Sequence, residues 1–187
     1  RNRTALNTFL GVRRHGSVSV PSVLEENLLK LKCDKVLLEI TEITRGRIST
    51  SQTFSDFLHY CALLLSARTD PVHTEQRSKA LRQLKTSYKD DEWEAFHQSF
   101  IELCGTFSRN IGYGIYEDLF AGPFTQIGAA SRTLKQDFTP ADVGKLIGAI
   151  SIPSKLSLPE EGFFSLGDQA CGSGTLLLAG VQRFADI

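Results

Sequence analysis

Residues 162–180 read GFFSLGDQACGSGTLLLAG, a stretch in which an apolar run, a glycine-rich turn and a second apolar run follow one another. The first run, Gly162 to Asp168, has the length and aromatic content of a short β-strand. The second run, from about Gly174 to Phe184, is long enough for a helix. Strand, glycine turn and helix in this order open an α/β nucleotide-binding fold, so we expect the start of a Rossmann-like domain here.

Three known loops share this shape, and each requires residues that this chain lacks. A phosphate-binding P-loop has a Lys after its second glycine, where this chain has Ser173. A dinucleotide-binding loop has a third glycine where this chain has Leu177. A nucleophile elbow centred on Ser173 would have glycines in place of Cys171 and Thr175. The sequence therefore disfavours a nucleoside triphosphate, NAD or FAD as ligand, and it disfavours a serine hydrolase.

The remaining pattern is an acidic residue at the strand end, followed by a tight turn with Gly172 and Gly174. Such a turn lets the backbone closely approach a small ligand that carries no phosphate. S-adenosylmethionine is a ligand of this kind, because it carries a sulfonium cation, an ammonium group and a carboxylate. Asp168 would favour its cationic end, while free N–H groups at the helix start would bind an anionic or polar group.

A second segment with clear local signals lies upstream, where residues 136–146 read QDFTPADVGKL. Thr139 is a typical N-cap residue, and Pro140 suits the first helical position, where its missing N–H costs nothing. Asp142 follows in the first turn, where a negative charge suits the helix dipole. These signals predict a helix over residues 139–151.

Together the two segments resemble a known family. Residues 168–175, DQACGSGT, are similar to the Asp-Pro-Ala-Cys-Gly-(Ser/Thr)-Gly cofactor motif of adenine-specific DNA methyltransferases, especially the modification subunits of type I restriction systems. Residues 136–146 are similar to that family's Gly-Gln-aromatic-Phe-Thr-Pro segment, which precedes the glycine motif at this spacing. Two departures are Gln169, in place of the usual Pro, and Asp137, in place of an aromatic or apolar residue.

The resemblance implies that the two segments hold S-adenosylmethionine from opposite sides. In the family, the Phe-Thr-Pro turn covers the methionine portion of the cofactor, and the acidic residue with its glycine turn holds the other side. Cys171 lies inside this turn with no adjacent base, so we do not expect it to act as a covalent nucleophile. The cofactor-binding residues expected from the resemblance are Gln136, Phe138, Thr139, Pro140, Asp168, Ala170, Cys171, Gly172, Ser173, Gly174 and Thr175.

Residues 22–108 show the periodicity of amphipathic helices. Ser22-Val-Leu-Glu25 is a capping box, and further helices are predicted from about residue 51, over 74–88 and from Asp90. Their aromatic residues are spaced by three and four, which favours packing in a core over a base-stacking surface. The predicted apolar faces are Leu29, Cys33, Val36 and Ile40; Phe54, Phe57, Leu58, Cys61, Leu64 and Leu65; Leu81, Leu84 and Tyr88; and Trp93, Phe96, Phe100, Leu103 and Phe107.

The segment Arg109 to Gly114 contains two glycines and breaks the helical pattern, so we expect a domain boundary there. Beyond it, Tyr116 to Phe120 suggests a short helix, and residues 121–135 and 153–161 read as loops. The sequence thus predicts an α-helical N-terminal domain over residues 1–110. Residues 111–187 would be the beginning of the S-adenosylmethionine-dependent methyltransferase domain. The resemblance implies that residues 1–110 correspond to the helical domain that precedes the catalytic domain in this family.

Composition excludes other kinds of site. Lys plus Arg and Asp plus Glu both count 21, so no net field marks the chain as a nucleic-acid binder. The four cysteines have no Cys-x-x-Cys spacing and the histidines do not cluster with them, which argues against a metal site or a disulfide framework. No apolar run approaches the length of a membrane span, and a reducing cytoplasm is the expected location. The resemblance implies DNA and a DNA-recognition (specificity) subunit as partners.

Methylation of adenine also needs groups that bind the flipped base, which the family supplies with an Asn/Asp-Pro-Pro-aromatic segment. This chain contains no such segment, and no carboxylate for the cofactor ribose at about twenty residues beyond the glycine turn. We therefore expect a truncated front part of a DNA adenine methyltransferase, with no catalytic residue and little methyl transfer by itself. Two other functions stay open: a non-catalytic helical module that docks on a DNA-recognition subunit, and a methyltransferase acting on RNA or protein.

Overall fold

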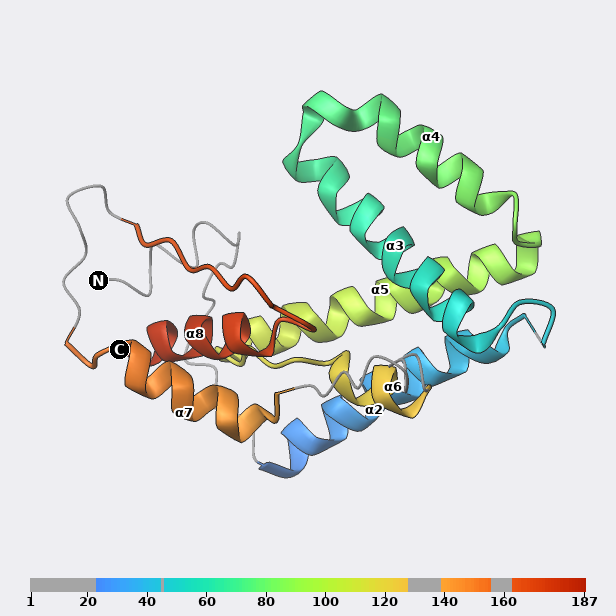
Figure 1. The fold of residues 1–187 in the computed structure, drawn as a ribbon. Helices are drawn as coiled ribbons and strands as arrows, with labels where there is room; N and C mark the ends of the chain where they lie inside the picture. Colours follow the sequence, from blue (N-terminus) through green and yellow to red (C-terminus); the bar gives the residue numbers. More distant parts are fainter. Residues whose placement is uncertain (1–22, 45, 128–138, 156–162) are drawn as a thin grey trace. The chain divides into compact units, whose positions relative to one another are not determined.

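The computed structural model describes residues 23–44, 46–127, 139–155 and 163–187, and all the regular secondary structure in these ranges is helical (Figure 1). In chain order the elements are α2 (Val23–Glu42), α3 (Thr50–Thr69), the 3-10 helix η1 (Pro71–His73), α4 (Thr74–Lys85), α5 (Asp90–Tyr113), α6 (Ala121–Gln126), α7 (Ala141–Ser151) and α8 (Thr175–Asp186). The chain divides into two compact units. Of the described residues, 28–44, 46–106 and 122–127 form the aromatic unit, and 23–27, 107–121, 139–155 and 163–187 form the glycine unit.

The expectation of an α/β Rossmann-like domain start is wrong, because the described ranges contain no strand and no sheet. Residues 163–168, the described part of the predicted strand, form an irregular segment. Its apolar side chains Phe163, Phe164 and Leu166 are 41% to 64% exposed. A strand is stabilised only when a neighbouring strand pairs with its backbone, and no such neighbour exists among the described residues. The apolar composition of this segment predicted a strand, but composition alone does not show whether a second strand is present to pair with it.

The aromatic unit is built from helices whose apolar stripes were predicted. On α2, Cys33, Val36 and Ile40 are buried, as their spacing indicates; the Ser22 capping box and the side chain of Leu29 lie outside the described part of the chain. On α3, Phe54 and Phe57 are fully buried. The predicted faces therefore form most of this core. The core also includes Leu37, and α3 leaves Leu65, which we assigned to its buried face, largely exposed.

Aromatic rings fill the centre of this unit and confirm that they serve as core. The rings of Tyr60 and Trp93 meet edge to face with centroids 5.0 Å apart, and those of Phe57 and Phe96 do the same at 5.3 Å. Edge-to-face pairs of this kind stabilise by about 0.5 to 1.5 kcal/mol beyond the burial of their area. Tyr88 joins the cluster from the connection after α4, with its ring 4.7 Å from that of Phe96.

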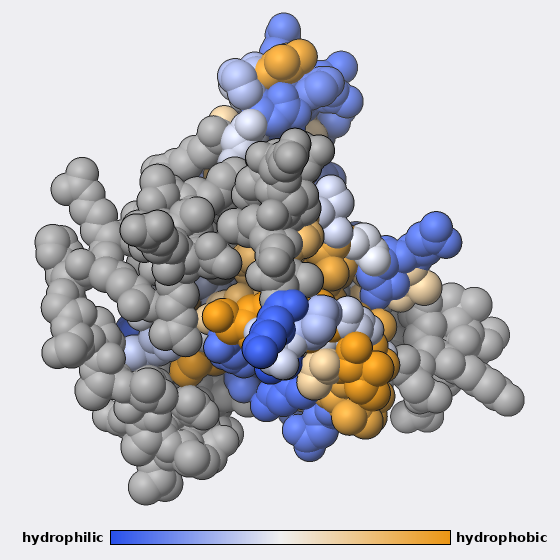
Figure 2. All heavy atoms as spheres, turned by 90° about the vertical axis from the view of Figure 1, so that its left-hand side faces the viewer, coloured by the Kyte–Doolittle hydropathy of each residue, from blue (hydrophilic) through white to orange (hydrophobic). Residues whose placement is uncertain are grey.

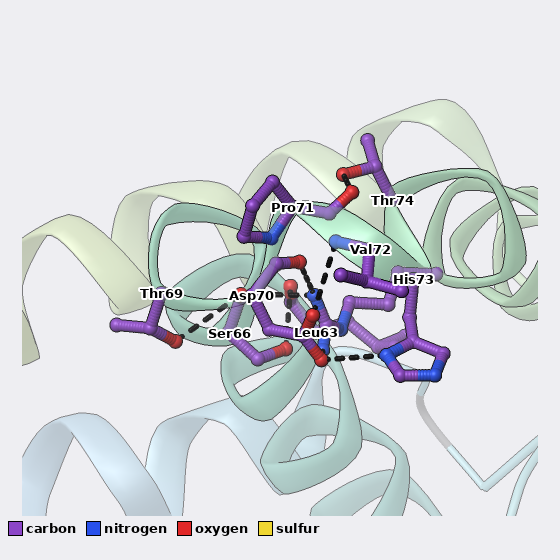
Figure 3. A network of polar contacts seen from close by, with 9 residues as sticks. Leu63, Ser66, Thr69, Asp70, Pro71, Val72, His73 and Thr74 are labelled. Carbon is purple, nitrogen blue, oxygen red and sulfur yellow. Dashed lines mark hydrogen bonds and ion pairs between the residues drawn. The ribbon is translucent and has the colours of Figure 1, made fainter.

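A polar network turns the chain from α3 into η1 and α4 (Figure 3). The Asp70 side chain accepts from the backbone N–H of Val72 at 3.1 Å and pairs with His73 Nδ1 at 2.7 Å. The Arg77 guanidinium binds the Asp70 carboxylate and donates to the Ser66 carbonyl at 3.0 Å. The hydrogen bond from His73, assisted by Arg77, lowers the pKa of Asp70 to about 2. The carboxylate thus stays charged at neutral pH and fixes the corner.

The predicted break at Arg109–Gly114 is wrong for most of that segment, because α5 continues through it to Tyr113. Gly114 ends the helix with a left-handed φ of +78°. The N–H of Ile115 then donates to the Asn110 carbonyl at 2.8 Å, and that of Gly114 to the Ile111 carbonyl at 2.9 Å, which is a Schellman motif. The short helix predicted at 116–120 is also wrong: the described helix, α6, begins at Ala121, within a predicted loop.

Candidate functional site

Helices α7 and α8 lie side by side in the glycine unit and run parallel (Figure 1). A Cβ atom on Gly144 would lie 3.3 Å from Cγ2 of Thr175, and a Cβ on Gly148 would lie 3.1 Å from the carbonyl oxygen of Ala179. One turn forward on α7 thus corresponds to one turn forward on α8. The two helices therefore begin at the same end of the pair, and their backbones approach closely because glycine occupies both α7 positions.

This arrangement brings together the two segments predicted to bind the cofactor. Thr139 and Pro140 precede α7, the glycine turn precedes α8, and both therefore lie at the end of the pair where the helices start. Thr139 is half-buried and Pro140 exposed. Gln136 and Phe138 lie outside the described residues.

The predicted helix over 139–151 is present as α7, but its start is one residue later than predicted. Pro140, not Thr139, is the N-cap residue, with φ −58° and ψ 143°, and no side chain caps the helix. The fixed φ of proline fits this extended cap conformation as well as it fits the first helical position. Asp142 lies in the first turn, as its charge indicates.

The glycine turn has backbone angles that favour glycine. Gly172 and Gly174 have φ of +52° and +89°, in the left-handed region, and the N–H of Gly174 donates to the Cys171 carbonyl at 2.7 Å. A Cβ on Gly174 would meet nothing within 4 Å, so conformation and not crowding favours glycine there. Gly174 is the N-cap of α8, which confirms the helix predicted over 174–184. Ala170 and Cys171 are exposed on the surface of this turn.

Asp168 has one satisfied and one unsatisfied carboxylate oxygen. Its Oδ1 accepts from the N–H of Ala170 at 2.9 Å, which shapes the entry to the turn. Its Oδ2 is buried and has no hydrogen-bond partner among the described residues. A buried unpaired acceptor is costly and uncommon in a folded protein. This oxygen can accept a hydrogen bond from an N–H or O–H group of a ligand, and it attracts a cation.

A chain of hydrogen bonds holds the other side of the turn. Thr175, the buried first residue of α8, donates from Oγ1 to Asp118 Oδ2 at 2.7 Å, and the Ser173 hydroxyl lies 3.1 Å from Thr175 Oγ1. Asp118 Oδ1 accepts from the backbone N–H groups of Phe120 and Ala121. The sequence did not reveal Asp118, because it lies 57 residues from Thr175 and belongs to neither motif.

A cavity of about 290 Å³ in the aromatic unit contains none of the predicted site residues. Its guanidinium, Arg77, is already bound to Asp70. The cavity is lined by residues of α3, η1 and α4: His59, Leu63, His73, Gln76, Arg77 and Ala80.

The described ranges contain no group of three or more His, Cys, Asp and Glu side chains that could hold a metal ion. In the same ranges, no helix combines the length and the hydrophobicity that crossing a bilayer requires.

Comparison of the chain with protein-family models, with curated proteins and with solved structures gave no match in any of the three. The likeness to DNA methyltransferases therefore depends on two short segments, residues 136–146 and 168–175.

Proposed function

We propose that this chain carries the S-adenosylmethionine-binding part of an adenine-specific DNA methyltransferase, of the kind that serves as modification subunit in type I restriction systems. The observation that carries the proposal is the packing of Gly144 against Thr175. This contact makes the two family-like segments neighbours at one end of a helix pair, although the second half of α7 and residues 152–167 separate them along the chain. A cofactor held from two sides requires such a neighbourhood.

The chemistry at this end suits the proposed cofactor. Asp168 presents an unpaired buried oxygen, which matches the ammonium, sulfonium and hydroxyl groups of S-adenosylmethionine. Gly172 and Gly174 have left-handed backbone angles and carry no side chain, so a ligand can closely approach the backbone of the turn. Nothing in this turn offers a lysine or arginine for a phosphate. The site is therefore better suited to a cationic, phosphate-free ligand than to a nucleotide.

Methyl transfer needs further groups that hold the target adenine opposite the sulfonium methyl. The sequence has no Asn/Asp-Pro-Pro-aromatic segment, so we assign no catalytic residue to this chain and expect it to bind the cofactor without transferring the methyl group. The proposed partners are DNA and a DNA-recognition subunit, and the proposed location is the cytoplasm, where these substrates occur.

Titration calorimetry with S-adenosylmethionine tests this proposal. We expect the wild-type chain to bind and Asp168→Asn to bind at least about tenfold more weakly, because an amide replaces a charge-assisted acceptor at nearly constant shape. Asp186→Asn is the matched control: this exposed carboxylate on α8 accepts only from Gln182 at 2.9 Å among the hydrogen bonds described, and the variant should bind normally. Absence of binding to the wild-type chain, or equal binding by Asp168→Asn, would contradict the proposal.

One observation favours a second function, a non-catalytic helical module that docks on a DNA-recognition subunit. The outer face of α7 exposes Val143, Leu146, Ile147 and Ile150. In Figure 2, hydrophobic residues coloured orange are open at the surface beside hydrophilic ones. An exposed apolar face of this kind is typical of a protein interaction surface. The calorimetry separates the two functions, because a purely structural module would not bind the cofactor.

A further inference from the structure

The hydrogen bonds around Asp118 have a defined direction. A carboxylate can only accept, so the single hydroxyl proton of Thr175 is committed to Asp118 Oδ2. The oxygen of Thr175 is then left as an acceptor, and in the 3.1 Å contact with Ser173 the donor must be Ser173. The order of donation is therefore Ser173 to Thr175 to Asp118, and Ser173 retains only lone pairs toward its surroundings.

The segment that carries Asp118 is fixed along α8 at a second point. The N–H of Tyr116 donates to Gln182 Oε1 at 2.8 Å, two turns further along the helix than Thr175. The Schellman motif at Gly114 ends α5 immediately before this segment. Asp118 is thus placed by several independent contacts, and it is suited to hold the glycine turn.

We infer that Asp118 is the positioning residue of the glycine turn: through Thr175 it orients the Ser173 hydroxyl so that this oxygen accepts, and does not donate, a hydrogen bond from the ligand. Together with Asp168 Oδ2, the turn then presents two acceptors, and it selects ligands with N–H or O–H donors at this point. The identity of the ligand rests on the proposed function, whereas the positioning of the turn does not.

Asp118→Asn tests the direction of donation without removing the backbone contacts. The asparagine oxygen can still accept from the N–H groups of Phe120 and Ala121, while its amide would donate to Thr175 and reverse the order toward Ser173. We expect its affinity for S-adenosylmethionine to fall by about tenfold or more with an unchanged melting temperature. Thr175→Val should lose affinity similarly, and Thr175→Ser should retain it within about threefold, because it keeps the hydroxyl.

A readout without ligand keeps the test independent of the proposed function. Cys171 is exposed in the turn, and its alkylation rate can be followed in a Cys104→Ser background, because Cys33 and Cys61 are buried. Asp118→Ala releases Thr175 and Ser173, so we expect Cys171 to react several-fold faster, while Asp186→Asn leaves the rate unchanged.

The outcomes separate the two proposals. Weaker cofactor binding by Asp118→Asn and Thr175→Val, with rescue by Thr175→Ser, supports the positioning role. Equal binding by Asp118→Asn overturns it. If the wild-type chain binds no S-adenosylmethionine, the proposed function fails, and the alkylation rate decides alone: faster reaction of Asp118→Ala supports the positioning of the turn, and an unchanged rate overturns it.

Discussion

At the scale of single residues, Glu92 shows how a buried charge can stabilise this protein. Burial alone would raise the pKa of its carboxyl, but the Lys89 N–H at 2.8 Å and the Arg47 guanidinium outweigh burial and lower it. A carboxyl whose pKa is lower in the folded state stabilises above the unfolded value of about 4.3, and this contribution is lost as the pH falls through the folded value.

We therefore expect Glu92→Gln to lower the free energy of unfolding at pH 7 by roughly 1 to 2 kcal/mol, through loss of its charge-assisted hydrogen bonds. Urea denaturation at pH 7 and at pH 3 measures this, and the difference from wild type should shrink at the lower pH. Glu94→Gln is the control, since Glu94 lies exposed on the same helix and accepts from Gln98 at 2.7 Å. A pH-independent difference would show that the Glu92 charge is not the cause.

Single residues also show what sequence reasoning can and cannot find. Asp168, Gly172 and Gly174 were predicted because their types suit a tight ligand-binding turn, and the turn has the left-handed glycines that such a prediction needs. Their role in binding S-adenosylmethionine stays a prediction. Asp118 could not be predicted as a site residue, because its role depends on a hydrogen bond with Thr175 that forms only in the folded chain.

At the scale of elements, the packing of α7 on α8 depends on glycine at two positions. Alanine at 148 would gain up to about 1 kcal/mol of helix propensity, but its Cβ would lie 3.1 Å from the backbone of Ala179, so the helices would have to separate. Overpacking of this kind costs about 1 to 3 kcal/mol. We expect a net loss of stability of roughly 1 kcal/mol for Gly148→Ala, measured by thermal unfolding.

Gly112→Ala is the matched control for this helix pair. Gly112 lies in α5, within the same unit, and a Cβ there would meet nothing within 4 Å. Its substitution should therefore stabilise the protein by about 0.5 to 1 kcal/mol, because only the propensity changes. If the two alanine variants shift the melting temperature in the same direction, α7 and α8 are not in backbone contact.

Helices were predictable where sequence periodicity and tertiary packing agree. Phe96 and Leu103 lie on the apolar face of α5 and are buried in the core. Leu65 lies on the predicted apolar face of α3, but no described element covers it and it stays exposed. The strand at Phe163–Leu166 failed for a different reason. A short apolar run has the same pattern whether or not a second strand pairs with it; here Phe164 contacts the ring of Phe184 on α8 instead.

At the scale of the whole molecule, the two units reach stability by opposite means. The aromatic unit fills its core with large rings, so its helices are held by side chains. In the glycine unit, α7 and α8 pack closely because Gly144 and Gly148 carry no side chain. The apolar outer face of α7 is left exposed. Because the net charge of the chain is zero at pH 7, no long-range repulsion keeps such faces of different molecules apart.

We therefore expect the chain to self-associate at pH 7 through this apolar face. Ile150→Lys should reduce the association at pH 7, because it places a charge at the most exposed apolar position of α7, which is 75% accessible. Val72→Lys adds the same charge at an exposed residue of η1, in the aromatic unit. It therefore distinguishes an effect of net charge from an effect of the α7 face. Light scattering over protein concentration measures both. Equal reduction by the two variants would assign the effect to net charge, whereas reduction by Ile150→Lys alone assigns it to the face of α7.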